Sequence, residues 1–246
     1  MVRAGLVLAA AALLFAAPAI AQDTPPDLSG FWGPLFELGE PAADMVARLP
    51  ENTVVIADTG PAEFERGEYG GLVLTPEAVA HAEQWQPNRD LALDRVCLPP
   101  SIIYALQGPF PFELYQTPQL IVIRYEYFDQ VRLVFMDGQA ADEGTPHSKM
   151  GFSTGHWEGD ELVIETDHIA ASTITNNGLD HSDDIKMVER YRIDPASGQL
   201  TATQWFSDPA NLQNNGARWI AWQKRPGEHV YPYECDPSFA LEYEGR

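Results

Sequence analysis

The chain has 246 residues, and its 36 acidic side chains outnumber its 15 basic ones, which gives a formal net charge of −21. Nucleic acid and anionic membrane surfaces are therefore excluded as expected partners, because binding to phosphate groups needs clustered Lys and Arg. The length and composition predict one sizeable domain with its own core.

Residues 1–21 have the pattern of a secretory signal peptide. One arginine precedes an apolar, alanine-rich run, and Ala19-Ile20-Ala21 fits the small-residue rule for signal peptidase. No later segment approaches the roughly 20 apolar residues that a membrane span needs. We therefore expect an exported protein, periplasmic or secreted, that is not inserted into a membrane and begins at Gln22.

Residues 22–100 are irregular in pattern and rich in Pro and Gly, which predicts an N-terminal segment that wraps around the rest. One helix is expected from Thr75 to about Gln84, because Thr75 can cap it and the following Pro and Glu suit its first turn. A short opening strand is expected over 28–32.

From Gln119 onward the sequence changes to short apolar or alternating runs separated by turns. We expect strands near 119–128, 131–137, 149–158, 161–169, 184–194, 199–207 and 217–224. Closing such a sheet hides its edges. The prediction is a mainly β protein in which 101–246 form a lipocalin-like antiparallel barrel of about eight strands, within one globular domain over 22–246. A barrel of this size has room for one small ligand.

The alternation over 185–193 predicts which side chains face the interior. Glu189 shares a face with Met187 and Tyr191, and a buried carboxylate must be paired, hydrogen-bonded or protonated. If 195–198 form the turn to the next strand, Gln204 lies opposite Glu189. In the preceding hairpin, Gly159-Asp160 is expected to be a two-residue turn, since Gly suits the positive φ that such turns need.

The hairpin around Asp129-Gln130 has two mixed faces. A two-residue turn there places Glu126 and Asp137 on one face and Arg132 on the other, together with apolar residues on both. The sequence does not decide which of the two faces points inward. Glu126 therefore either lines a cavity or belongs to an outer ladder of charge pairs.

His181 is the preferred general acid or base among the histidines. Asp180, Ser182 and Asp183 surround it in the sequence, and nearby carboxylates are expected to raise the pKa of its imidazole. The alternatives are an ordinary acidic turn, or a divalent metal site built from Asp180, His181 and Asp183. No cofactor-binding motif occurs, so we expect no cofactor.

Two cysteines remain in a chain expected to be exported, where oxidising conditions permit a disulfide. No CxxC or Cys/His cluster accompanies Cys97 or Cys235, so a metal site made from them is not expected.

Several motifs, in this order and spacing, make residues 95–243 similar to a widespread family of exported bacterial proteins, which is lipocalin-like and mostly uncharacterised. They are CLPPS, PFELYQTPQLIVIRYEY, VRLVFMDG, GFSTGHWEGDELVIET, GLDHSDDIKMVERY and YPYECD. The resemblance implies that Cys97 pairs with Cys235. The chain departs from the family pattern at Ser101, where Gly is usual, at Gln139, where Arg is common, and at Phe152, where a polar residue is usual.

The resemblance also implies a function, namely hydrolytic cleavage of lignin-type β-aryl ethers without a cofactor. A barrel pocket would then bind a small, partly aromatic molecule. The acid-base groups would come from Glu189, His181, Glu126 and Asp137, and the ligand-binding groups from Tyr115, Gln116, Arg132, Ser182, Gln204 and Trp157. The alternative is a non-catalytic periplasmic protein that binds a small hydrophobic ligand.

Overall fold

The computed structural model describes residues 24–36, 40–57 and 64–242. The expected signal peptide, 1–21, lies outside these ranges. None of the helices that are described is both long enough and apolar enough to cross a membrane.

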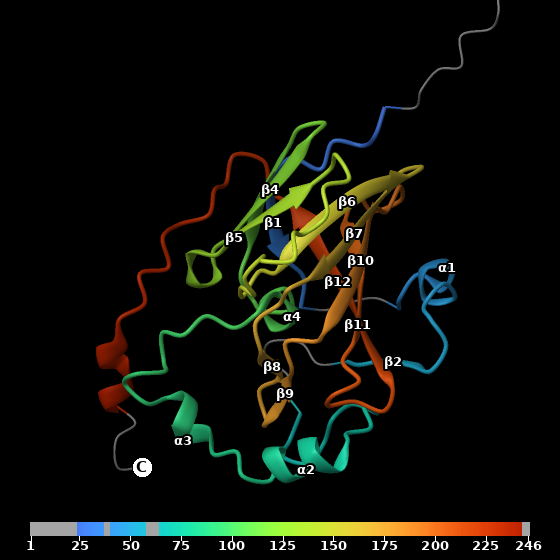
Figure 1. The fold of residues 1–246 in the computed structure, drawn as a ribbon. Helices are drawn as coiled ribbons and strands as arrows, with labels where there is room; N and C mark the ends of the chain where they lie inside the picture. The colour runs from blue at the N-terminus through green and yellow to red at the C-terminus, as the bar shows by residue number, and fades with distance from the viewer. Residues whose placement is uncertain (1–23, 37–39, 58–63, 243–246) are drawn as a thin grey trace, which may run out of the picture.

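The described chain is dominated by strands (Figure 1). The strands are β1 (Gly30–Pro34), β2 (Thr53–Val55), β3 (Phe112–Gln116), β4 (Leu120–Tyr125), β5 (Val131–Phe135), β6 (Phe152–Glu158), β7 (Glu161–Asp167), β8 (Ser172–Thr175), β9 (Leu179–His181), β10 (Lys186–Ile193), β11 (Leu200–Ser207) and β12 (Asn215–Lys224). The helices are α1 (Ala43–Val46), α2 (Pro76–Ala82), α3 (Pro87–Asp90), α4 (Ile102–Ala105), and the 3-10 turns η1 (Tyr127–Asp129) and η2 (Pro237–Glu242).

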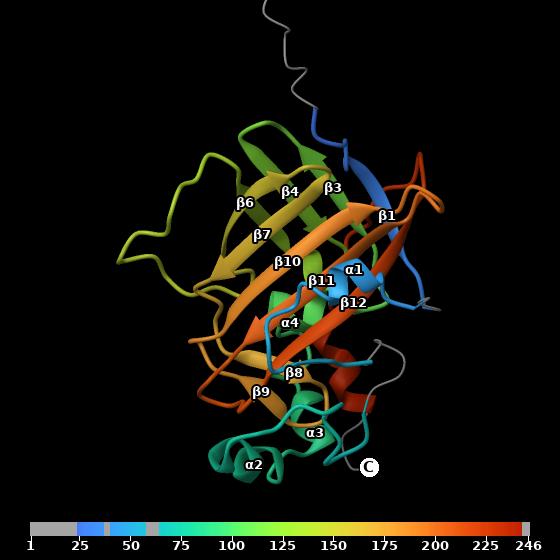
Figure 2. The same cartoon turned by 90° about the vertical axis from the view of Figure 1, so that its right-hand side faces the viewer.

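Nine of these strands close into a barrel, which confirms the predicted fold class. The order is β1-β3-β4-β5-β6-β7-β10-β11-β12, and β12 pairs with β1 to complete the ring. β2 adds a tenth strand beside β12, and β8 and β9 form a separate small sheet at one end (Figure 2). Closure leaves no long unpaired edge within the ring.

One pair in the ring departs from the antiparallel expectation. β5 and β6 run parallel, with Val134 opposite Ser153. A parallel pair cannot be joined by a tight hairpin. The long loop over 136–151 makes the connection instead. It extends into the predicted strand 149–158, so β6 begins at Phe152.

The predicted registers of two hairpins are confirmed. Glu158 lies opposite Glu161 across the turn that contains Gly159, whose φ is +66°. Glu189 lies opposite Gln204. Because side chains alternate along each strand, this register directs Glu189 and Gln204 into the barrel together.

The β4–β5 hairpin has a longer turn than predicted. Arg124, rather than Phe128, lies opposite Val131, and η1 occupies the turn. The shift is by an even number of residues, so the set of side chains on each face is unchanged. The structure settles the open question of direction, because Tyr125 and Arg132 are buried inside while Val131 is half exposed outside.

Helix α4 closes one end of the barrel (Figures 1 and 2). The Gln204 side-chain amide donates to the carbonyl oxygen of Ile102 at 3.1 Å, and Arg218 Nη1 donates to that of Ile103 at 2.8 Å. These bonds satisfy carbonyl groups of a short helix that would otherwise be buried without partners.

One strand of the barrel, β1, comes from the predicted N-terminal wrap, so the barrel is not confined to 101–246. The rest of the described N-terminal segment and the C-terminal segment lie outside the barrel (Figure 1). The predicted cap of α2 is present, since Thr75 Oγ1 accepts from the backbone N–H of Ala78 at 3.3 Å. Cys97 and Cys235 form the predicted disulfide, with an S–S distance of 2.05 Å. Such a bond is typical of proteins that fold in an oxidising compartment.

Candidate functional site

An ion pair between Arg132 and Glu189 lies inside the barrel. Arg132 Nη2 donates to Glu189 Oε2 at 2.5 Å, and both side chains have no exposed surface. The two residues come from β5 and β10, which are separated by β6 and β7 in the ring. A buried carboxylate is tolerated when it is paired and hydrogen-bonded in this way.

Three hydroxyl groups complete the surroundings of this pair. Tyr191 donates to Glu189 Oε1 at 2.7 Å, while Arg132 donates to Ser153 Oγ at 2.9 Å and Thr166 Oγ1 at 2.6 Å. Burial, and then the negative charge of Glu189, raise the pKa of the Tyr191 hydroxyl well above its ordinary value. Tyr191 therefore stays protonated and serves Glu189 as a donor.

Aromatic rings adjoin the polar centre. The ring centroids of Phe112 and Trp222 are 5.2 Å apart, those of Phe112 and Tyr125 5.9 Å, and those of Tyr191 and Trp222 6.0 Å. Aromatic walls around a few directed polar groups are the usual composition of a small-molecule site.

Three polar atoms on the β4–β5 hairpin have no hydrogen-bond partner within the described part of the chain. They are the Tyr125 hydroxyl, Gln130 Nε2 and Arg132 Nη1, and all three atoms are buried. Burial raises the pKa of Tyr125 to about 12. Gln130 Nε2 and Arg132 Nη1 can only donate, whereas the Tyr125 hydroxyl can also accept and interacts with Arg132, so this part of the interior has more donors than acceptors.

His181 belongs to a different hydrogen-bond group. Its Nδ1 lies 2.7 Å from the carbonyl oxygen of Ser182, so Nδ1 carries the proton and Nε2 accepts from the Ser101 hydroxyl at 2.7 Å. The prediction of a raised pKa was wrong. Burial lowers the pKa of His181 to about 4, and this outweighs the hydrogen bond to the Ser182 carbonyl and the nearby charge of Asp208, which both raise it.

The remaining predicted catalytic residues lie away from the interior. Glu126 is in the turn after β4, where its carboxylate accepts from the backbone N–H of Tyr231 at 3.2 Å. Asp137 is exposed and accepts from the backbone N–H of Gln139 at 3.1 Å. The structure does not bring either carboxylate to Glu189.

The predicted ligand-binding residues are also divided between separate places. Arg132 and Gln204 face the interior, and Trp157 is partly buried against the core. Tyr115 is 51% exposed on the outside of β3. Gln116 accepts from the backbone N–H of Leu28 at 3.1 Å, and Ser182 donates to Asp208 at 2.6 Å, so the structure gives both residues structural partners.

The suggested metal ligands do not converge. The two ring nitrogens of His181 face Ser101 and a carbonyl, while Asp180 lies 2.9 Å from His81. Within the described ranges, no group of three His, Cys, Asp or Glu side chains is arranged to hold a metal ion.

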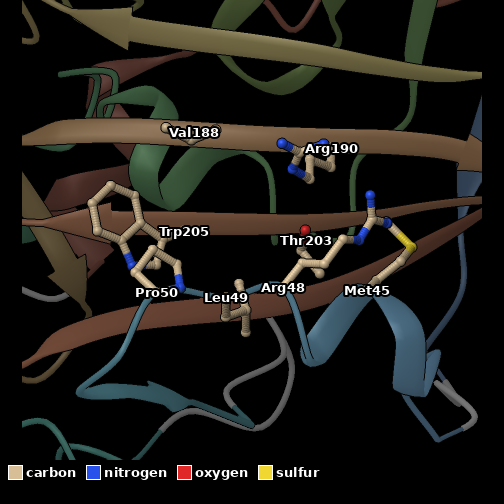
Figure 3. A pocket seen from close by; sticks show the side chains of 8 residues that line it. All are labelled: Met45, Arg48, Leu49, Pro50, Val188, Arg190, Thr203 and Trp205. Atoms are coloured by element: carbon tan, nitrogen blue, oxygen red, sulfur yellow. The ribbon is translucent and has the colours of Figure 1, made fainter. Parts of the chain in front are cut away.

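Two hollows lie on the outer surface of the barrel. The smaller, about 140 Å³, lies between α1 and strands β10 and β11, with Trp205 and Pro50 at one end and Met45 at the other (Figure 3). The larger, about 390 Å³, lies between the 138–141 loop and the outer faces of β6, β7 and β10. Neither hollow is lined by Glu189, Arg132 or His181.

Comparison of the chain with family models, with curated proteins and with solved structures finds no match in any of the three.

Sequence reasoning missed the hydrogen-bonding roles of Tyr191, Ser153, Thr166 and Ser101 and the inward position of the Tyr125 hydroxyl. Tyr191 had a usable signal, because it follows Glu189 by two residues on a strand and must share its face. Ser153 and Thr166 lie opposite each other in the correctly predicted hairpin, so their contact follows from the register. The contact between Ser101 and His181 had no such signal, because it joins segments 80 residues apart.

Proposed function

We propose that the barrel interior binds a small aromatic molecule beside Arg132 and Glu189, and that the protein hydrolyses an aryl ether C–O bond there. The observation that supports this most directly is the placement of Glu189, a wholly buried carboxylate held beside a guanidinium group and next to aromatic rings. Buried charged groups of this kind are concentrated at functional sites.

The proposed reaction needs only this chain and water. Glu189 takes a proton from a water molecule while the water oxygen bonds to the carbon of the ether linkage. The bond between that carbon and the phenolic oxygen breaks, and Arg132 Nη1 and the Tyr125 hydroxyl donate to the departing phenolate oxygen. The proton held by Glu189 then passes to the phenolate, so the products are an alcohol and a phenol.

His181 has no part in this scheme. Its hydrogen bonds go to Ser101 and Ser182, and no hydrogen bond links it to Glu189 or Arg132. Its low pKa also makes it neutral at pH 7, so it carries no spare proton for a leaving group.

A second candidate function is binding without catalysis. Both oxygens of Glu189 already accept a hydrogen bond, one from Arg132 and one from Tyr191. These two bonds pair the buried carboxylate, as a purely structural role would require, although each oxygen keeps a second lone pair. A carrier needs nothing more of Glu189.

Substitution of Glu189 by Gln tests whether the protein hydrolyses ethers or only binds a ligand. Turnover of a β-aryl ether dimer should fall ~10²- to 10⁴-fold, because the general base is lost, while the dissociation constant changes much less. Glu165→Gln is the matched control, since Glu165 is exposed on β7, the strand that pairs with β10. Unchanged turnover in the Glu189 variant removes that residue from the mechanism. Binding without turnover in the unaltered protein favours the carrier.

A further inference from the structure

We infer that the inner face of the β4–β5 hairpin is a ligand subsite, in which Tyr125, Gln130 and Arg132 donate hydrogen bonds to an aromatic carbonyl compound. The inference deepens the proposed function and rests on it for the location of the ligand. Beyond the proposed function, it identifies the side chains that bind the ligand and the chemical class of ligand that they select.

The three side chains are neighbours on one surface. Gln130 and Arg132 are two residues apart and both are buried, so they share the inward face where β5 begins. The backbone N–H of Tyr125 donates to the carbonyl oxygen of Gln130 at 2.8 Å, which places these two residues opposite each other. Directly opposed side chains have Cβ atoms roughly 4.5–5.5 Å apart, close enough to contact one ligand group.

Unpartnered buried donors are rare in folded proteins, and each one destabilises the fold. Four buried side-chain atoms of the described chain lack a partner, and three of them lie on this one hairpin face. The fourth, Gln107 Oε1, follows α4. The concentration of the donors distinguishes this face from the rest of the interior, where Gln204, Arg218 and Glu189 all have partners.

The chemistry of the donors defines the ligand. Gln130 Nε2 and Arg132 Nη1 can only donate, and the Tyr125 hydroxyl donates when it faces an acceptor. The ligand must therefore supply acceptor oxygens, and a carbonyl oxygen has two lone pairs for two of these donors. The rings of Phe112 and Tyr125, with Trp222 behind them, provide flat apolar surface beside the donors. A carbonyl attached to an aromatic ring satisfies both requirements.

Acetophenone and ethylbenzene form a matched pair of probes. They have nearly the same shape, and they differ in the carbonyl oxygen that the subsite would bind. Neither contains an ether bond, so their binding does not depend on whether the protein hydrolyses ethers. Unchanged turnover in the Glu189 variant would thus say nothing about the binding of these probes. Equal binding of the probes would likewise say nothing about turnover.

The test compares dissociation constants for the two probes in three proteins: the unaltered chain, Tyr125→Phe and Gln130→Met. Acetophenone should bind the unaltered chain about tenfold more tightly than ethylbenzene, and either substitution should remove most of this difference. Equal binding of the two probes, no binding of acetophenone, or an unchanged preference in both variants overturns the inference. Equal binding is the result expected if buried water fills the subsite.

Stability without ligand gives a second measurement. Tyr125→Phe removes an unpartnered hydroxyl and should leave the urea midpoint unchanged or raised. Tyr191→Phe is the control, because it deletes the hydrogen bond to Glu189 and should lower the midpoint. A fall in both variants would show that the Tyr125 hydroxyl is bonded within the protein, which overturns the inference.

Discussion

The burial of His181 should make the stability of the fold depend on pH. The imidazole is 1% exposed and accepts a hydrogen bond from Ser101, so the fold holds it in the neutral form. Protonation would place a charge at Nε2, where the serine hydroxyl now donates. The fold therefore resists protonation until the pH is well below the range in which a free histidine titrates.

The free energy of unfolding should consequently depend on pH through His181. The unfolded chain takes up the proton near pH 6.5, whereas the folded chain does so near pH 4. The stabilisation is thus fully present above pH 6.5 and is lost as the pH falls toward 4, by about 3 kcal/mol in all. Urea unfolding between pH 7 and pH 4 measures this loss, with His181→Gln as the variant that lacks the titrating group. Parallel curves for the two proteins would contradict the prediction.

The alternation of side chains along a strand predicts the inward direction of Glu189 but not that of Arg132. Glu189 was placed inside correctly because its companions Met187 and Tyr191 are apolar or aromatic. Arg132 could not be assigned to a face, because Val131 and Leu133 beside it are equally apolar. The structure leaves those two 50% and 45% exposed, so the outer face of this hairpin is unusually apolar and the pattern alone carries no direction.

At the scale of elements, ion pairs attach α1 and the residues after it to the barrel. Asp44 of α1 pairs with Arg192 on β10, and Arg48 pairs with Glu161 on β7. Glu161 accepts from Arg48 at 2.7 Å and from Arg190 at 2.8 Å, and its side chain is only 4% exposed. Burial raises the pKa of Glu161, but the hydrogen bonds from Arg48 and Arg190 outweigh that effect and lower it overall. A four-residue helix is far too short to be stable alone, so these ion pairs and the buried Met45 fix its position.

Substitution of Glu161 by Gln should therefore weaken the attachment of α1 to the barrel. We expect a loss of about 2 kcal/mol, because two guanidinium groups lose their shared acceptor. Glu158→Gln is the matched control. Glu158 also binds Arg190, but its side chain is 47% exposed, and surface pairs contribute less than about 1 kcal/mol. Urea midpoints give the energies, and faster tryptic cleavage after Arg48 reports the weaker attachment of the helix. Equal losses in the two variants would show that α1 does not depend on Glu161.

The elements themselves were largely predictable, whereas some of their connections were not. The Gly159 turn and the Glu189–Gln204 register followed from local turn chemistry and a period of two residues. The parallel β5–β6 pair and the positive φ of Phe128 and Asp129 depend on contacts made elsewhere in the chain. Asp129, for example, accepts from the backbone N–H of Tyr233, a contact across 104 residues.

At the scale of the whole molecule, hydrogen bonds and a disulfide tie the C-terminal segment to the rest of the chain. His229 contacts Glu113 of β3 at 2.8 Å. The backbone N–H groups of Tyr231 and Tyr233 donate to Glu126 and Asp129, respectively, and Cys235 is joined to Cys97 (Figure 1). The two hydrogen bonds are exposed and therefore weak individually. The covalent bond is the contact that constrains the unfolded chain.

Removal of the disulfide should destabilise the molecule without changing its fold. Cys97 and Cys235 are 138 residues apart in the sequence, and a loop of that length corresponds to about 4 to 5 kcal/mol in the chain-entropy model. The double variant Cys97→Ala/Cys235→Ala should lose this amount in urea unfolding, while its far-ultraviolet circular dichroism stays that of the barrel. The barrel persists because both cysteines lie outside its strands, and the hydrogen bonds that Glu126 and Asp129 accept still hold the C-terminal segment. The unaltered protein under reducing conditions provides the control and should match the double variant. A loss of strand signal in either sample would mean that the barrel itself depends on the disulfide, and that its closure by β1 and β12 does not suffice.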